Sequence, residues 1–357
     1  MPTRSSRYPV RQICWPELGI SWWPLSDLDD ESSSIIRVER PWVFRWVFSP
    51  QVIAGDPAEP LREDTAVGFA HERGDCPADS GDRGVRERRG PLLTALANAG
   101  LSPIAAVRSV KHSSGSPERL LNFEDPATFA PALEDVGSVF LMRPPQISDT
   151  KRYLRPFIAA MEQAGVEHAV FLSLMGVNRA MPHWQVEHDL QASSVPWTFL
   201  RPSFFSQNLN GAYGADIRDH DRIRLPSGRG RTNFIDTSDI ADVAALVLAD
   251  PVSHVGEAYT LTGPAALDYA TVASVLPVAL GRPIVYEPIG LLRYRSELRA
   301  GHLPGVYVNV QLLINVVARL GLAAKVNDVL PTLLDRPART LQQFIEDRID
   351  AWRTTSA

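Results

Sequence analysis

The sequence predicts an α/β fold built on a doubly wound parallel sheet, with a smaller α+β lobe towards the C-terminus. Short apolar stretches of strand length alternate with helical stretches from Pro91 to Pro202, which is typical of βαβ units. The predicted strands are apolar almost throughout, as strands covered on both faces are. Polar or conformationally special residues follow several of them directly, at the sheet edge where such folds bind ligands.

Two segments end in glycine, as helices commonly do: Pro91–Ala99 before Gly100, and Asp149–Ala164 before Gly165. The other predicted helices of this part are Ala127–Val136 and Pro182–Ser193. The predicted strands are Ile104–Val107, Leu120–Phe123, Ser138–Met142, His168–Leu174 and Trp197–Leu200. This alternation predicts a parallel sheet whose strands are joined by right-handed crossovers.

After Ser203 the alternation is looser, which indicates a smaller lobe that would close over the ligand edge. Strands are predicted at Phe234–Asp236, Ala258–Thr262 and Ile284–Glu287, helices at Thr237–Asp250 and Tyr269–Leu280, and mostly helix from Gln311 to Trp352. Thr237 or Ser238 would cap the first of these helices. Four arginines (Arg222, Arg224, Arg229 and Arg231) suggest a solvated basic loop. The predicted division is 1–90, 91–255 and 256–357.

Residues 1–90 differ in character from the rest and are predicted to be irregular or disordered. Five of the eight tryptophans precede residue 47, and residues 74–90 are polar and charged without a hydrophobic period. Only Pro41–Phe48 resembles a strand.

Composition excludes several classes of function. Net charge is −5 with both signs interspersed, so no basic face indicates nucleic-acid binding. No apolar run reaches the roughly 20 residues that span a membrane, and no secretory signal is evident. The only cysteines are Cys14 and Cys76, which leaves the main domain without a disulfide or thiolate metal site and favours the cytoplasm. A small-molecule partner is expected, and the oligomeric state stays open.

Five motifs carry a family resemblance: SVFLMRPP (Ser138–Pro145), AVFLSLMGV (Ala169–Val177), PWTFLRPSFFSQNL (Pro196–Leu209), NFIDTSDIADV (Asn233–Val243) and YTLTGP (Tyr259–Pro264). In order and spacing they resemble the NmrA-like NAD(P)-binding family of atypical short-chain dehydrogenases, over about residues 91–288. The resemblance implies a Rossmann-like fold and NAD(P) binding. Members include quinone and triphenylmethane-type reductases, and redox-sensing regulators that bind the dinucleotide without consuming it.

The resemblance also implies where the cofactor lies. Arg108 matches an arginine that often contacts the adenosine 2′-phosphate, which favours NADP over NAD, since a guanidinium suits a phosphate. Asn122 and Phe123 match the adenine edge. The remaining matches run from the pyrophosphate to the nicotinamide and substrate: Arg143, Pro144, Pro145, Ser173, Leu174, Pro202, Phe204 and Asn208, with Phe205 an alternative to Phe204 as the stacking ring.

The family's first strand and glycine-rich turn are missing. That turn lets the backbone approach the pyrophosphate at a helix N-terminus, yet the chain contains no G-x-G-x-x-G, and Gly81 and Gly84 follow no strand. As written, the chain would lose its phosphate cradle and a central strand, leaving neighbouring backbone groups unpaired. We therefore predict weak or absent dinucleotide binding by the chain as written.

One hypothesis is a reading-frame change just before Pro91. Codons compatible with Asp82–Gly90, read one base later, can spell T-G-A-S-G-N-V-G, and those of Asp75–Gly81 can spell the apolar strand I-V-L-L-I-L-V. The codon of His71 can become a start codon. The three lysines against 33 arginines indicate a G+C-rich gene, in which such codons are natural. The alternative is a genuine unusual N-terminus in which Pro41–Phe48 supplies the first strand, at the cost of a structureless loop of about 40 residues.

Catalytic candidates are few. No lysine follows a tyrosine by four, which excludes the usual Tyr-x-x-x-Lys proton relay, and Gln185 stands where some relatives carry a lysine. His183 could act as an acid or simply pair with Glu187 one turn later. Ser173 could bind substrate or cap the next element. The spacing of His183, Glu187 and His188 does not suit a metal site, so none is expected.

The function predicted is hydride transfer from NAD(P)H to a small quinone-like or carbonyl substrate. Two alternatives stay open: a non-enzymatic NAD(P) redox-sensing regulator, and a non-functional product of a gene with a disrupted reading frame. Consumption of NAD(P)H in the presence of quinones would distinguish the oxidoreductase from the regulator.

Overall fold

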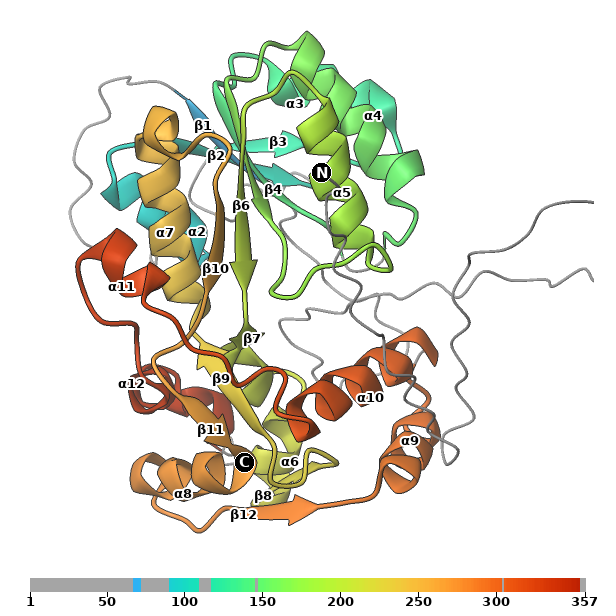
Figure 1. The fold of residues 1–357 in the computed structure, drawn as a ribbon, viewed down its shortest axis with the longest axis vertical. Helices are drawn as coiled ribbons and strands as arrows, with labels where there is room; N and C mark the ends of the chain where they lie inside the picture. Colours follow the sequence, from blue (N-terminus) through green and yellow to red (C-terminus); the bar gives the residue numbers. More distant parts are fainter. Residues whose placement is uncertain (1–66, 72–89, 109–116, 145–146, 304, 354–357) are drawn as a thin grey trace, which may run out of the picture. The chain divides into compact units, whose positions relative to one another are not determined.

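A seven-stranded sheet organises the structure, a computed structural model that describes residues 67–71, 90–108, 117–144, 147–303 and 305–353 (Figure 1). Side by side, its strands are β10 (Ala258–Leu261), β6 (Trp197–Pro202), β5 (His168–Leu172), β4 (Ser138–Met142), β1 (Val67–His71), β2 (Ser102–Val107) and β3 (Glu118–Leu120). Strands β10, β6, β5 and β4 are mutually parallel, as are β2 and β3. The predicted α/β class is confirmed.

The central strand β1 runs in the opposite direction. It pairs antiparallel with β2 (Val67 opposite Ala106) and with β4 (Val67 opposite Leu141). A strand therefore exists inside the segment predicted to be irregular, and the prediction that β2 and β4 would lack backbone partners is wrong. Pairing of these inner edges satisfies hydrogen-bonding groups that would otherwise be costly to bury. The other strand candidate, Pro41–Phe48, lies outside the described residues.

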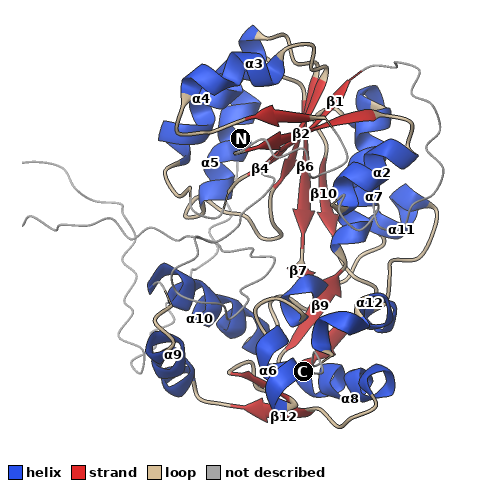
Figure 2. Cartoon of the chain, turned by 180° about the vertical axis from the view of Figure 1, so that it is seen from behind, coloured by secondary structure: helices blue, strands red, loops and turns tan. Residues whose placement is uncertain are grey.

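Helices cover both faces of the sheet, as Figure 2 shows. On one face lie α2 (Pro91–Asn98), α7 (Thr237–Ala249) and α11 (Val329–Leu334), and on the other α3 (Phe129–Leu133), α4 (Thr150–Gln163) and α5 (Pro182–Ala192). A short 3-10 turn, Pro126–Thr128, precedes α3. None of the helices that the structure describes is both long and apolar enough to cross a membrane.

Most predicted boundaries agree with the structure to within two residues, and the differences have local causes. Gly100 and Gly165 follow α2 and α4 with φ of 77° and 71°, the left-handed conformation expected after a helix. The cap of α7 is Asp236, whose carboxylate accepts from the amide of Ser238 at 2.8 Å, rather than Thr237 or Ser238. The strand expected at Leu120–Phe123 is Glu118–Leu120 instead, and a turn follows at Phe123 and Glu124.

The smaller lobe contains two short sheets. The first joins β7 (Phe204–Phe205), β9 (Arg231–Ile235) and β11 (Ala266–Asp268), and the second joins β8 (Arg222–Leu225) and β12 (Val285–Pro288). Around them lie α6 (Gly214–His220), α8 (Tyr269–Leu280), α9 (Leu291–Ala300), α10 (Gly305–Arg319) and α12 (Leu341–Asp347), with 3-10 turns at Ser206–Leu209, Pro251–His254 and Ile349–Trp352. The division predicted at residue 256 stays a prediction; β10, which follows it, pairs within the large sheet.

The segment expected to be a solvated basic loop is partly the strand β8. Arg224 lies opposite Glu287 in the pairing of β8 with β12 and bonds it at 3.1 Å, and its Nη1 lies 2.8 Å from Glu297. Arg222 pairs with Asp216 at 3.4 Å. That expectation is wrong for these two arginines because carboxylates from α6, α9 and β12 surround them.

Two arginines near the C-terminus attach that part of the chain to α7. Asp239 is fully buried, and its Oδ1 lies 2.8 Å from Nη2 of Arg336. Arg339 contacts the same carboxylate with its guanidinium, and its backbone amide donates to Oδ2 at 2.8 Å. The half-buried neighbour Asp242 accepts from both arginines. Residues 100 positions apart in the sequence are thus joined through one buried carboxylate.

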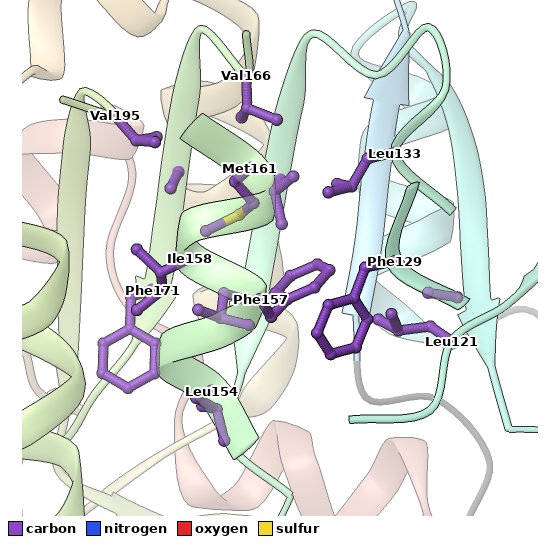
Figure 3. Packing of buried hydrophobic residues seen from close by; sticks show 14 of the residues in the cluster. Leu121, Phe129, Leu133, Leu154, Phe157, Ile158, Met161, Val166, Phe171 and Val195 are labelled. Atoms are coloured by element: carbon purple, nitrogen blue, oxygen red, sulfur yellow. The ribbon is translucent and has the colours of Figure 1, made fainter. Parts of the chain in front are cut away.

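The largest core cluster lies between the sheet and helices α3, α4 and α5 (Figure 3). Phe157 of α4 is fully buried at its centre. Its ring meets those of Phe123 and Phe129 edge-on, with centroids 5.2 and 5.3 Å apart. Edge-to-face contact adds to the free energy gained by burying the rings.

We predict that Phe157→Ala lowers the free energy of unfolding by about 3–5 kcal/mol, because it leaves a cavity that three elements line. Chemical denaturation measures the loss. The matched control is Leu292→Ala on the exposed side of α9, which should change stability by no more than about 0.5 kcal/mol. Equal losses in the two variants would show that Phe157 is not packed as described.

Candidate functional site

Three polar residues stand at the same level on the neighbouring strands: Arg143 and Ser173 directly follow β4 and β5, and Arg201 is the last residue but one of β6. Met142 lies opposite Leu172, and Leu172 opposite Leu200, so the next residues, Arg143, Ser173 and Arg201, continue one row across the sheet. We call these three the polar row. Side chains alternate along a strand, and the residues two positions earlier (Leu141, Phe171 and Phe199) belong to the core under α4 and α5. The polar row therefore faces α5.

Helix α5 contributes a carboxylate that binds the polar row. Both oxygens of Glu187 accept from Arg201, Oε1 from Nε at 2.9 Å and Oε2 from Nη2 at 2.6 Å. This two-pronged geometry is the strongest form of the pair. Glu187 is buried and Arg201 half-buried, with its guanidinium 5.9 Å from the ring centroid of Phe199. The pair attaches the middle of α5 to the end of β6.

His183, one turn earlier on α5, is buried against Phe171, with ring centroids 6.1 Å apart. Its Nδ1 has no hydrogen-bond partner among the described residues. The prediction that it pairs with Glu187 is wrong, because Arg201 occupies both carboxylate oxygens. Burial, and then the charge of nearby Arg143, hold the pKa of His183 well below its ordinary 6.5. The imidazole is therefore neutral near pH 7.

Ser173 also carries a buried polar atom without a hydrogen-bond partner in the described part of the chain. Its hydroxyl is buried and finds no partner among the described residues, so the prediction that it caps the next element is wrong. Its backbone amide continues the sheet by donating to the carbonyl of Leu200 at 2.8 Å.

Arg143 is buried directly after β4 and bonds to two backbone carbonyls that follow it. Its Nη1 donates to the carbonyl of Ile147 at 2.6 Å and to that of Pro144 at 3.0 Å. Pro144 is half-buried, and Pro145 lies outside the described residues. The contact of this segment with a pyrophosphate stays a prediction.

The other predicted cofactor residues are placed at different depths. Arg108 is exposed directly after β2, as a residue that contacts a phosphate at the sheet edge would be. Phe123 is buried in the core against Phe157. Leu174 and Pro202 are buried beside the polar row, Phe204 is half-buried with its ring edge-on to Phe234 at 5.5 Å, and Asn208 is half-buried in the turn after β7. The side-chain amide of Gln185 donates a hydrogen bond to Oδ1 of Asp189 at 2.9 Å.

The sequence did not assign a role to Asn233, which links Ser203, just after β6, to the smaller lobe. Asn233 is fully buried; its Oδ1 accepts from the hydroxyl of Ser203 and from the amide of Gly263, and its Nδ2 donates to the carbonyl of Lys325. A Cβ at Gly263 would lie 1.7 Å from the carbonyl oxygen of Phe234, so no other residue fits there. Both residues stand in recognised motifs, but single-sequence patterns do not reveal contacts over 30 positions.

A dinucleotide fits this edge only in part. The ends of β2, β4, β5 and β6 supply polar side chains where such ligands bind, and the space around Gly90, at the N-terminus of α2, is open. The phosphate cradle is not formed by the described residues. Val67 pairs near the end of β2, and His71 pairs with its first residue, Ser102. Strand β1 thus ends at the opposite edge of the sheet.

Comparisons with known proteins agree with this architecture. The family described as NAD(P)H-binding matches residues 90–251. An NAD(P)H azoreductase of Xenophilus azovorans is 31% identical over 266 residues, which cover 73% of this chain and 90% of that protein. Two solved structures share the fold. The Citrobacter triphenylmethane reductase complexed with NADP(H) has a TM-score of 0.64 at 21% identity, covering 72% of this chain and 95% of its own. The negative transcriptional regulator NmrA in complex with NADP has a TM-score of 0.57 at 17% identity, covering 73% and 93%.

The pair of Glu187 and Arg201 generates a test of how α5 is held. We predict that Arg201→Gln lowers the free energy of unfolding by about 3 kcal/mol, because it leaves a buried carboxylate without its cation. Glu187→Gln should cost less, since the half-buried Arg201 can be hydrated. Arg293→Gln is the control, because its pair with Glu297 is exposed and is worth at most about 0.5 kcal/mol. A loss for Arg201→Gln no larger than the control would contradict the buried pairing.

Proposed function

This chain belongs to the NmrA-like, NAD(P)H-binding family, and on that basis we propose that it is an NAD(P)-dependent oxidoreductase acting on a small quinone-like or carbonyl substrate. The observation that carries the proposal is the polar row, which lies at the carboxyl edge of the sheet inside the matched segment. When bound, the reduced nicotinamide supplies a hydride, and the acceptor takes it up with one proton. We further propose that the protein is located in the cytoplasm.

The acceptor class follows from the chemistry that the edge can support. The edge has no tyrosine–lysine relay, so a substrate that needs a strong protein acid is disfavoured. A quinone needs little acid, because the charge it gains is spread over a conjugated ring and ends on oxygen. The relatives named for azo and triphenylmethane dyes also reduce conjugated acceptors. Arg108, exposed after β2, favours NADP over NAD.

The reversed β1 bears on whether this chain can bind its cofactor. We propose that residues 72–89 are the product of a shifted reading frame, and that the intended chain carries a parallel first strand followed by a glycine turn into α2. Three observations support this: the frame one base later can encode start, strand and turn in order; α2 begins with an open glycine at position 90; and the sheet accepts a strand between β2 and β4. The chain as written should then bind NAD(P) weakly.

The test compares two proteins for NADPH and NADH binding by calorimetry. One is the chain as written, and the other starts with Met at the codon of His71 and continues in the shifted frame to Pro91. We expect only the second to bind, with NADPH preferred, and to oxidise NADPH in the presence of a quinone. Binding without oxidation of NADPH would favour the redox-sensing regulator instead. Arg108→Ala in the second protein should reduce the preference for NADPH by about tenfold, the effect of roughly 1.4 kcal/mol.

Equal NADPH binding by both proteins would overturn the frame proposal and would mean that residues before Gly90 build a phosphate site of another kind. Genomic DNA that shows no insertion or deletion relative to close relatives would also overturn it. A matched control replaces the second glycine of the restored turn by valine. This variant should lose NADPH binding while keeping its thermal stability, because that glycine is needed where the backbone approaches the phosphates.

A further inference from the structure

Exposed hydrophobic side chains gather where α10 ends. In the described part of the chain nine large hydrophobic residues are exposed, and three of them fall within positions 320–326. They are Leu320, Leu322 and Val326, which are 53%, 67% and 39% exposed. Single hydrophobic residues on a surface need no explanation, whereas a group of them with polar residues around it indicates a binding surface.

The backbone holds these side chains on a fixed turn. The amide of Leu322 donates to the carbonyl of Val317 at 3.1 Å, and Gly321, between the two leucines, has a φ of 72°, as at the end of a helix in a Schellman motif. The chain then runs beside β9, because the amide of Asn233 donates to the carbonyl of Ala323 at 3.0 Å. The exposed leucines are therefore part of the packed structure.

Two arginines of the turn between β8 and β9 lie beside the end of α10 (Figure 1). Arg229 and Arg231 are exposed, unlike Arg224 of the same segment, which is held by carboxylates. Gly230, between them, touches the helix so closely that a Cβ there would clash with the carbonyl of Ala318. The part of the expected basic loop that stays exposed thus meets the exposed hydrophobic residues.

The end of α10 adds two further cations to this surface. Arg319 is exposed, and its Nη1 donates to the carbonyl of Pro226 in the turn at 3.3 Å. Lys325 is exposed, and its carbonyl accepts from Nδ2 of Asn233, two residues beyond Arg231 on β9. We call the four cations and the three hydrophobic residues the basic apolar patch.

The basic apolar patch is positive, although the whole chain carries a net charge of −5. The segments that build it, 222–231 and 305–327, contain six basic residues and no acidic one. Two carboxylates adjoin it: Asp268, which lies opposite Arg231 in the pairing of β9 with β11, and Asp328, which follows the second segment. Among the described residues, no carboxylate forms an ion pair with any of the four cations. The patch keeps an excess of two positive charges.

An anionic lipid surface is the partner that matches both features. Lysine and arginine are attracted to anionic headgroups, and exposed leucine and valine side chains can enter the boundary between headgroups and acyl chains. A nucleic acid would use the cations, but its phosphates would leave the leucines in water. An apolar protein partner would have to bury the cations without counter-charges.

We propose that the basic apolar patch docks this protein on a membrane surface that contains anionic phospholipids. Asn233 connects this surface to the candidate site, because it accepts from Ser203, just after β6, and donates to Lys325. Docking would hold the carboxyl edge of the sheet close to lipid, in which quinone-like compounds dissolve. The inference goes beyond the proposed function and does not depend on it, because vesicle binding requires neither cofactor nor substrate.

Co-sedimentation of the full chain with vesicles tests the proposal. One set of vesicles is phosphatidylcholine alone, and in the other a third of the lipid is phosphatidylglycerol. We expect binding to the second set only. Raising the ionic strength from about 0.05 to about 0.5 M should weaken it strongly, because salt screens the exposed charges.

Two double variants separate the contributions of charge and of hydrophobic insertion. Arg229→Gln with Lys325→Gln should weaken binding about 25-fold, since each cation near an anionic surface is worth about fivefold. Leu322→Ser with Val326→Ser should weaken it by about tenfold, because less apolar surface is buried. Both variants change exposed side chains only, so thermal unfolding should stay unchanged.

Matched controls carry the same changes outside the patch. Lys151→Gln with Arg152→Gln, on the exposed side of α4, removes two charges, and Val252→Ser with Val255→Ser removes two exposed hydrophobic residues. Both controls should bind anionic vesicles as the unchanged chain does. Absence of binding to anionic vesicles, or equal weakening by the controls, would overturn the proposal. Binding that depends on the two cations but not on Leu322 and Val326 would also overturn it and would favour a nucleic acid or an acidic protein instead.

Discussion

The hydrogen-bonded alignment of β4, β5 and β6 is the constraint on which the candidate site depends. These strands are parallel and aligned by their pairing, so Arg143 after β4, Ser173 after β5 and Arg201 near the end of β6 stand at one level of the sheet. Buried aromatic and aliphatic side chains two residues earlier secure the same face against α4 and α5. A shift of one residue in any of the strands would turn its polar side chain to the opposite face. The geometry of Arg143, Ser173 and Arg201 is therefore a product of the sheet rather than of the loops.

The reversed β1 shows how strongly the same sheet needs a strand in its centre. A gap between β2 and β4 would leave two inner edges without backbone partners, and a short stretch of the chain fills it in the antiparallel sense. Antiparallel pairing satisfies the hydrogen bonds as well as parallel pairing does. An antiparallel strand differs from a parallel one in that its C-terminal end lies at the opposite edge of the sheet. Stability of the sheet and formation of a phosphate cradle are thus separate requirements, and the described residues meet the first.

Much of the fold could be predicted from the sequence because local patterns determine it. Ser138–Met142 and Tyr269–Leu280 have the predicted bounds, since an apolar strand followed by Arg-Pro and a helix between polar ends are local signals. Strand β1 could not be predicted, because the pairing that makes Val67–His71 a strand comes from residues over 30 positions away. The same holds for the bond of Asn233 to Lys325 and for the ion pair of Arg224 with Glu287. At the site, Ser173 and His183 were identified by position, but Glu187 pairs with Arg201 rather than with His183, a contact between elements that local patterns do not reveal.

The attachment of Asp239 to Arg336 and Arg339 has a consequence for synthesis on the ribosome. Helix α7 and the strands of the large sheet emerge long before residues 336–339, so until then this carboxylate has neither guanidinium to neutralise it. A lone charge in an apolar interface opposes its own burial. The nascent chain should therefore keep α7 loosely attached, and accessible to chaperones, until nearly the whole protein has been made. The large domain is therefore complete only after the segment between α11 and α12 has been synthesised.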